Sequence, residues 1–338
     1  MNKSRKVLLI VVMCMVLLLT GCTAGETMSS KENQITIVCT TFPLYDWTRN
    51  LLGETEAEVL LLLNNGTDMH SFQPSAQELI QIADCDILVH VGGESDRWLE
   101  EALAAQPNEE RRVVNLTEVI GADMKEETIT EGMQTTHVHA DGTVHDEEDC
   151  KEEQVHEESK DEHVWLSVRY AKKCCDAIKD ALCLVLPEEA DDIRNNHTTY
   201  CQELDLLDEA YAELAQEMED EVLLVADRFP FLYLAEDYGM EYYAAFPGCS
   251  TESEADFETV IFLAEKINEH KIDTIFITES GTDALAKALI ENAEYKGQEI
   301  SVLHSMQVVY QSDIENGCSY VGYMEANLAA LQEAFVEK

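Results

Sequence analysis

The sequence predicts an α/β protein with two similar lobes, each a mostly parallel sheet with flanking helices, joined by one long rigid helix. Three observations support this prediction. Short apolar runs alternate with amphipathic stretches in both halves of the chain, which is typical of parallel strands covered by helices. Residues 191–219, between the halves, show the clearest helical periodicity. Beyond residue 220 the alternation of strand-like and helix-like segments begins again.

The first 21 residues predict a targeting segment that is not part of the fold. A positively charged start precedes an apolar run, residues 7–19, which is too short and too early for an ordinary membrane-spanning helix. The run leads into Leu19-Thr20-Gly21-Cys22, which resembles the bacterial lipoprotein signal, in which the cysteine is acylated. We therefore expect lipidation at Cys22 and a tether over residues 22–34. The protein would then lie outside the cytoplasmic membrane, attached by its lipid anchor alone.

The N-terminal lobe is expected over residues 35–187. Predicted strands cover residues 35–39, 59–63, 87–91 and 113–116, and predicted helices cover residues 45–52, 75–83, 98–105 and 168–185. Turn signals bound these runs, among them Asn64-Asn65-Gly66 and the pair Gly92-Gly93.

Residues 125–162 interrupt this lobe with acidic sequence that lacks hydrophobic periodicity. The segment contains four histidines: His137, His139, His145 and His156. Imidazoles crowded among carboxylates suit a transition-metal ion, although a solvated, disordered charge run is the simpler alternative. We expect a long loop that collects metal with low affinity or senses it near the main site.

The linker helix is expected over residues 188–219. Its apolar side chains, from Ile193 to Met218, recur at alternating spacings of four and three residues and so share one helix face. The C-terminal lobe follows over residues 220–338. Its predicted strands cover residues 222–226, 241–245, 274–277 and 300–303, and its predicted helices cover residues 231–238, 257–270, 283–292 and 323–336.

The charge and the cysteine content narrow the range of functions that suit this chain. The chain has 22 basic and 68 acidic residues, a formal charge of −46. This charge argues against nucleic acid as a partner and suits a protein that gathers cations. There are 11 cysteines, none in CxxC spacing, and several lie on apolar segments, so we expect mostly free thiols.

Three histidines outside the acidic segment lie just beyond predicted strands, where open α/β sheets bind ligands. His70 follows residues 59–63, His163 ends the acidic segment, and His304 follows residues 300–303. Each alone is better explained as a structural residue, but three equivalent positions from both lobes predict a metal centre. Zinc binds about four nitrogen, sulfur or oxygen ligands, so three imidazoles and a carboxylate would suit it.

Several motifs resemble those of the zinc/manganese solute-binding proteins of bacterial ABC transporters. They are TFPLY at 41–45, HSFQP at 70–74, HVWLS at 163–167, and Asn327-Leu328 in the last predicted helix. The likeness runs from about Ile35 to the C-terminus, and the acidic histidine-rich segment is similar to that of zinc-type members. The resemblance implies a monomer with one metal between its lobes, His70 and His163 as ligands, and a permease with its ATPase subunit as partners.

The chain departs from the family pattern at one ligand position. Arg228 stands where many members have a third ligand, and a guanidinium cannot coordinate a metal. His304 matches the final ligand position, which is Asp in manganese-type relatives, so the third imidazole is expected there. A carboxylate, Asp227 or Glu279, would complete the shell or neutralise Arg228. Nitrogen in place of oxygen favours Zn²⁺ over Mn²⁺.

These inferences predict a receptor that captures zinc and delivers it to an ABC transporter permease for import. A manganese receptor or an adhesin on the same fold is the first alternative. An extracellular zinc hydrolase is the second, with Glu279 as the base that activates a metal-bound water. The sequence has no His-Glu-x-x-His motif or nucleophile elbow, so we expect no enzyme.

Overall fold

The computed structural model describes residues 34–134, 137–138, 144–145, 160–218, 221–250 and 254–336. From Ile35 onward these residues belong to one unit. The predicted leader and the lipidation site at Cys22 lie outside the described residues. No helix in the described part is long and apolar enough to cross a membrane.

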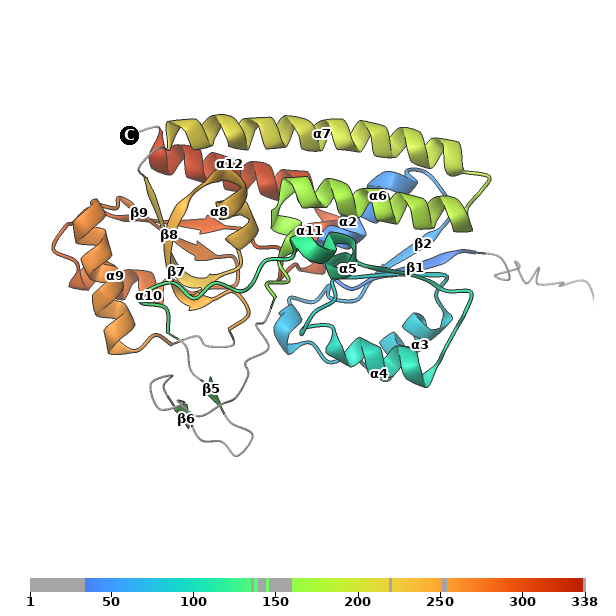
Figure 1. Ribbon diagram of the computed structural model, residues 1–338, viewed down its shortest axis with the longest axis horizontal. Coiled ribbons are helices and arrows are strands. Elements are labelled where there is room, and N and C mark those ends of the chain that lie inside the picture. Colours follow the sequence, from blue (N-terminus) through green and yellow to red (C-terminus); the bar gives the residue numbers. More distant parts are fainter. Residues whose placement is uncertain are drawn as a thin grey trace, which may run out of the picture. The chain divides into compact units, whose positions relative to one another are not determined.

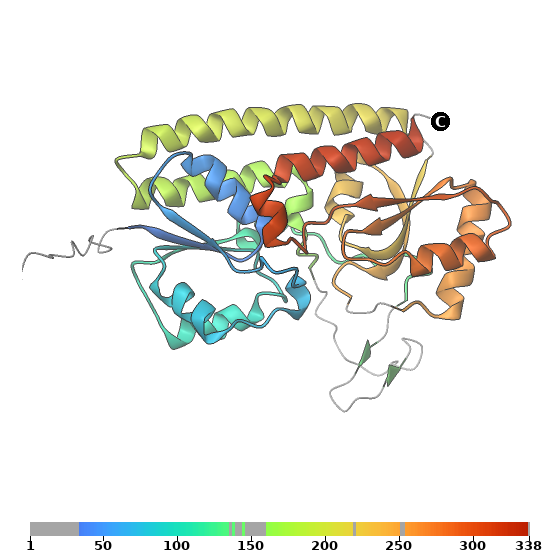
Figure 2. The same ribbon diagram turned by 180° about the vertical axis from the view of Figure 1, so that it is seen from behind.

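Four parallel strands form the N-terminal sheet in the order β2-β1-β3-β4. The strands are β1 (Thr36–Cys39), β2 (Glu58–Leu61), β3 (Ile87–His90) and β4 (Arg112–Asn115). All four residues of β3 are buried, as a parallel sheet covered on both faces requires. Helices α2 (Phe42–Leu52) and α6 (Val168–Val185) cover one face, and α3 (Ala76–Asp84) and α4 (Arg97–Ala105) cover the other (Figures 1 and 2).

The C-terminal sheet repeats this design, with four parallel strands in the order β10-β9-β7-β8. Its strands are β7 (Val222–Phe229), β8 (Glu241–Pro247), β9 (Thr274–Thr278) and β10 (Glu299–Leu303). Its helices are α8 (Leu232–Tyr238), α9 (Phe257–His270), α10 (Ala284–Asn292), α11 (Gln311–Glu315) and α12 (Tyr320–Phe335). The carboxyl ends of the strands in each lobe lead into the loops that carry the candidate ligands.

One long helix, α7 (Ala190–Glu217), joins the two sheets and has 28 residues. It packs on α2 and α6 in the N-terminal lobe and on α8 and α12 in the C-terminal lobe. The Tyr211 hydroxyl on α7 donates a 2.7 Å hydrogen bond to the Met324 carbonyl on α12, and both residues are buried. The predicted fold class, two parallel α/β lobes joined by a long helix, is confirmed. We retain 35–187, 188–219 and 220–338 as the proposed limits of lobes and linker.

The acidic segment is more ordered at its ends than the sequence suggested. Gln134 donates its backbone N–H to Ala245 in β8, and Met133 is buried. At the other end Asp161 and Glu162 are 1% exposed. The described ends of the segment contain no helix or strand, in agreement with the expected loop, but they pack against the two lobes.

Inside the segment, β5 (His137–Val138) and β6 (Val144–His145) pair as antiparallel strands, with His137 opposite His145. His139 and His156 lie outside the described residues. The sequence also missed α5 (Leu116–Ile120), α11 and the single-turn 3-10 helices η2 (Met69–Ser71) and η5 (Val164–Leu166).

Candidate metal centre

His70 and His163 are held by short 3-10 turns rather than by the sheet itself. Asp68 precedes η2, and its carboxylate accepts the backbone N–H of His70 at 2.9 Å. His163 stands at the start of η5, and its backbone N–H donates to Asp161 at 2.8 Å. Each imidazole therefore has a fixed backbone, which limits the motion of its ring.

The two rings face each other through their Nε2 atoms, which are 3.3 Å apart. Two nitrogens bound to one tetrahedral zinc, each about 2.0–2.1 Å from the metal, are separated by roughly 3.3 Å. The sequence prediction that His70 and His163 lie together thus agrees with the structure. Their spacing fits one shared zinc ion.

The outer nitrogen of His163 is bound to a carboxylate. Its Nδ1 lies 3.0 Å from Asp161 Oδ1, and both side chains are almost completely buried. Burial lowers the pKa of His163, but the charge and hydrogen bond of Asp161 outweigh it and leave the pKa raised. With the proton held on Nδ1, the Nε2 lone pair faces His70 and is available to a metal.

His70 reaches a second carboxylate through a serine. Its Nδ1 lies 2.8 Å from the Ser95 hydroxyl, which donates to Glu162 Oε1 at 3.0 Å. Burial raises the pKa of Glu162 to about 7. Burial and the neighbouring His163 lower the pKa of His70 to about 3, so this ring is neutral at physiological pH. The relay orients a neutral imidazole toward His163.

A cysteine is the third residue of the cluster. The ligand atoms of His70, His163 and Cys249 all lie within 4.8 Å of one another, and no other such group of three or more His, Cys, Asp or Glu occurs in the described chain. Cys249 follows β8, so it comes from the C-terminal lobe. Sequence reasoning missed it because Cys249 was grouped with the other cysteines as a free thiol and was given no role as a ligand. Its place just beyond a strand was the available signal.

The three C-terminal residues predicted as ligands lie elsewhere. The His304 ring lies 4.8 Å from the Tyr323 ring, and its backbone bonds the Asn327 side chain in both directions. The carboxylates make other bonds. Glu279 accepts from the backbone and hydroxyl of Ser305 and from Val308, and Asp227 accepts from the backbone and hydroxyl of Thr278. The structure therefore does not group His304, Glu279 or Asp227 with the two imidazoles.

Arg228 is neutralised by a residue that the sequence analysis did not consider. Its Nη2 lies 2.6 Å from Asp68 Oδ2, and both side chains are largely buried. Between Asp227 and Arg228 the structure describes one hydrogen bond, which the Arg228 backbone N–H donates to the Asp227 carboxylate. The expected partners, Asp227 and Glu279, are replaced by Asp68 because Asp68 lies on the facing lobe, beside His70.

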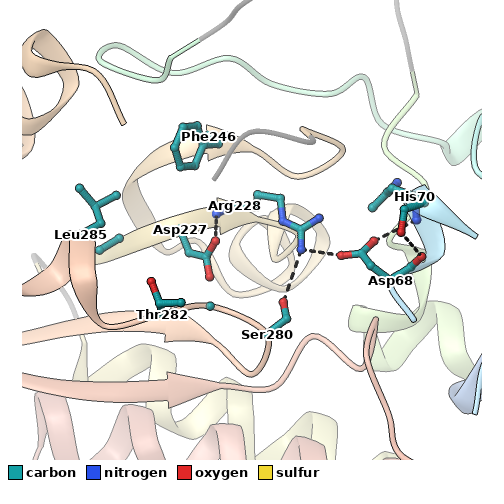
Figure 3. A pocket seen from close by; sticks show the side chains of 11 residues that line it. Asp68, His70, Asp227, Arg228, Phe246, Ser280, Thr282 and Leu285 are labelled. Atoms are coloured by element: carbon teal, nitrogen blue, oxygen red, sulfur yellow. Dashed lines mark hydrogen bonds and ion pairs between the residues drawn. The ribbon is translucent and has the colours of Figure 1, made fainter. Parts of the chain in front are cut away.

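The Asp68–Arg228 ion pair borders a cavity of about 270 Å³ that extends into the C-terminal lobe. Figure 3 shows Arg228 directed at Asp68, with His70 on the far side of that carboxylate. Ser280, Thr282 and Phe246 line the rest of the cavity. His70 is therefore reached from a solvent-connected cavity that residues of both lobes line.

All eight described cysteines are free thiols, as predicted. Burial raises the pKa of the Cys249 thiol well above its usual range. Cys150 lies outside the described residues.

Comparison with known proteins gives the family. Residues 37–334 match the family described as "Zinc-uptake complex component A periplasmic", ZnuA. The zinc-binding lipoprotein AdcA of Streptococcus pneumoniae is 29% identical over 329 residues, which cover 97% of this chain and 61% of that protein. The high-affinity zinc uptake system protein ZnuA of Bacillus subtilis is 24% identical over the full length of both chains.

Among solved structures, the Zn(II)-bound ZnuA-like domain of Streptococcus pneumoniae AdcA superposes with a TM-score of 0.69 at 27% identity, covering 90% of this chain and 99% of that domain. TroA of Treponema pallidum, a periplasmic zinc-binding protein, gives a TM-score of 0.69 at 22% identity over 90% of this chain and 99% of its own, and supports the fold. The chain spans about three fifths of the length of the AdcA relative. The match over residues 37–334 shows that the chain belongs to the family of zinc-uptake complex component A proteins.

Proposed function

We propose that this protein is an extracytoplasmic receptor that captures zinc and delivers it to the permease and ATPase of an ABC transporter. One observation carries the proposal: the imidazoles of His70, which is half-buried, and His163, which is fully buried, face each other with Nε2 atoms 3.3 Å apart. Their outer nitrogens are bound to Asp161 and, through Ser95, to Glu162. Outer carboxylates that fix the tautomer of an imidazole are typical of zinc sites.

Capture and release follow from the placement of the site between two sheets. The imidazoles belong to the N-terminal lobe, whereas Arg228, Asp227 and Cys249 belong to the C-terminal lobe. A small shift of one lobe relative to the other changes the distances between donors from the two sides. A bound ion would therefore be held in the closed arrangement and released to the permease when contact with the transporter separates the lobes.

The family and the names of the relatives support zinc uptake and give no support to adhesion. A receptor needs neither a catalytic base nor a substrate groove, and we propose no enzymatic activity. Manganese is disfavoured because nitrogen and sulfur donors favour zinc, whereas oxygen donors favour manganese.

Three further parts of the proposal concern the chain around the site. We propose acylation at Cys22, with the lipid as the membrane attachment and a monomeric receptor beyond it. We also propose that the acidic segment collects zinc through its four histidines, His137, His139, His145 and His156. His304, Glu279 and Asp227 are proposed to support the C-terminal side of the site by the hydrogen bonds and ring contact described above.

The test is zinc titration of His70→Ala and His163→Ala against a chelator of known affinity. We expect both variants to lose tight zinc binding while keeping the circular dichroism spectrum of the wild type. His270→Ala is the matched control, because His270 ends α9 and lies apart from the cluster. Wild-type zinc affinity in both variants would refute the proposed site.

A further inference from the structure

We propose that the C-terminal lobe completes the zinc shell with the Cys249 thiolate and the Gln307 side-chain carbonyl oxygen. The donor set would then be two imidazoles, one thiolate and one amide oxygen. This inference rests on the proposed function and specifies its chemistry. It also explains how the chain binds zinc although Arg228 stands at a family ligand position.

The distances allow Cys249 to bind the same ion as the imidazoles. Its sulfur and the two imidazole nitrogens lie within 4.8 Å of one another. In a tetrahedral site with zinc–sulfur near 2.3 Å and zinc–nitrogen near 2.0 Å, nitrogen and sulfur are roughly 3.5 Å apart. An approach of about 1 Å between the lobes therefore suffices, which is within the range of small domain-closure movements.

The turn that carries Cys249 is built to lie against His163. A Cβ at Gly248 would stand 2.8 Å from the Phe229 carbonyl oxygen and 3.1 Å from Cε1 of His163, so only glycine fits without a shift. The next backbone N–H, that of Cys249, donates to Glu127 Oε1 at 2.8 Å. Close approach on one side and a hydrogen bond on the other thus hold the thiol beside the imidazole.

Arg228 acts as a positioning residue between the two sides. Its Nη2 bonds Asp68, two residues before His70, and its Nη1 donates to the carbonyl of Ser250, the residue after Cys249. A cation cannot be a ligand. Through these two hydrogen bonds Arg228 connects the loop that carries His70 to the turn that carries Cys249.

Gln307 supplies the fourth donor. It is 4% exposed, and its side-chain nitrogen lies 2.5 Å from Nε2 of His163. At this distance the amide N–H donates to the His163 lone pair. Rotation of the amide by half a turn replaces nitrogen with oxygen at nearly the same place, and the carbonyl oxygen is a metal donor.

The loop around Gln307 is held rigidly enough for this role. Met306 has a positive φ of 60°, which is unusual for a residue with a side chain and turns the loop inward. Glu279 accepts hydrogen bonds from Ser305 and Val308, which flank Met306 and Gln307 in the chain. Glu279 therefore positions the loop of the proposed fourth ligand rather than binding metal.

The test is cobalt substitution of the full chain under reducing conditions, with one equivalent of Co²⁺ per protein. We expect a thiolate-to-cobalt charge-transfer band in the near ultraviolet for the wild type and its loss in Cys249→Ser. Cys183→Ser is the matched control, because Cys183 lies on α6 and bonds Ala190. We expect this control to keep the band.

Zinc affinity gives the second measurement. Cys249→Ser should weaken zinc binding at least about tenfold, because a lost ligand should cost no less than a lost outer partner. Gln307→Leu should also weaken zinc binding but keep the cobalt band, and Gln307→Glu, which retains an oxygen, should restore affinity. If Gln307→Leu binds zinc as tightly as the wild type, Gln307 is not a ligand and the fourth donor is another group.

The outcomes separate this inference from the proposed function. A wild-type cobalt spectrum without the band, or unchanged zinc affinity in Cys249→Ser, would overturn the inference. If His70→Ala and His163→Ala still lose zinc in that case, the receptor proposal stands with a different C-terminal donor. If these two variants bind zinc normally, the receptor site itself is wrong and the inference fails with it.

Discussion

Replacing Asp161 with asparagine tests whether an outer carboxylate tunes the metal centre. Asp161 Oδ1 accepts both the backbone N–H of His163, at 2.8 Å, and its Nδ1–H, at 3.0 Å. Water is excluded, because Asp161 is 1% exposed and His163 is fully buried. Asparagine keeps the shape and one acceptor oxygen but removes the charge. Loss of such a partner typically weakens metal binding about 10–100-fold, or about 1.4–2.7 kcal/mol.

The effect of Asp161→Asn on zinc affinity should depend on pH. Asp161 keeps the pKa of His163 raised, so a proton competes with zinc for this ring as the pH falls through that pKa. In Asp161→Asn the pKa of His163 falls, and competition by protons begins at a lower pH. The variant should therefore bind zinc more weakly than the wild type at pH 8, with a smaller difference in acid.

Chelator competition across this pH range measures both effects. Asp237→Asn is the control, because Asp237 is a half-buried carboxylate that accepts a hydrogen bond from the Ser167 hydroxyl. If Asp161→Asn matches the wild type within a factor of two at every pH, outer carboxylates do not tune this site.

Three further predictions follow from other parts of the structure. Burial raises the pKa of Asp46 from its ordinary value of 3.8 to about 6. The protonated carboxyl group therefore contributes stability that is fully present below pH 3.8 and is lost as the pH rises through 6. Asp46→Asn should therefore raise the free energy of unfolding at pH 8 by up to about 3 kcal/mol, with little change at pH 4, as measured by urea denaturation. Deleting residues 135–159 should preserve the fold and the tight site but lower zinc stoichiometry by metal analysis. An equal stoichiometry would leave the segment as solvated charge. In a mixture of equal zinc and manganese, native mass spectrometry should find zinc retained, and equal retention of manganese would contradict the nitrogen- and sulfur-rich site.

The limits of this deletion show where sequence patterns failed. Lack of hydrophobic periodicity predicted a loop over residues 125–162 and gave no sign that its ends contact the metal centre. The structure instead places Asp161 on the His163 ring and Glu127 on the backbone of Cys249. Single polar contacts of this kind leave no periodic signal, because they depend on chain segments that meet only in the folded protein. A deletion from Lys125 to Asp161 would remove both contacts.

Most of the fold was predictable because its elements are regular. Helix α7 extends over Ala190–Glu217, against a predicted 188–219, since its apolar stripe repeats over many turns. The five-residue helices α5 and α11 were missed, because one helical turn is too short to establish a period. The same limit hid η2 and η5, the turns that orient His70 and His163.

The candidate site was half predictable for a related reason. His70 and His163 belong to contiguous motifs, so a single segment identifies each. The C-terminal donors do not: Cys249 lies in a turn fixed by Gly248, and Gln307 lies in a loop fixed by Glu279 and the conformation of Met306. His304 looked equivalent to the other histidines because it also follows a strand. Its ring instead packs on Tyr323, and the strand end alone does not determine that orientation.

The two sides of the site differ in rigidity, and this difference suggests an order of binding. His163 is fully buried, and both imidazoles are bound at Nδ1, so the N-terminal pair is preformed at the spacing zinc requires. Cys249 and Gln307 lie on loops that follow β8 and β10, and the thiol must move closer to reach the same ion. Zinc should thus bind the imidazole pair first, with closure of the C-terminal lobe adding sulfur and oxygen. Release would reverse this order, because the loop-borne donors can withdraw without disturbing the imidazole pair.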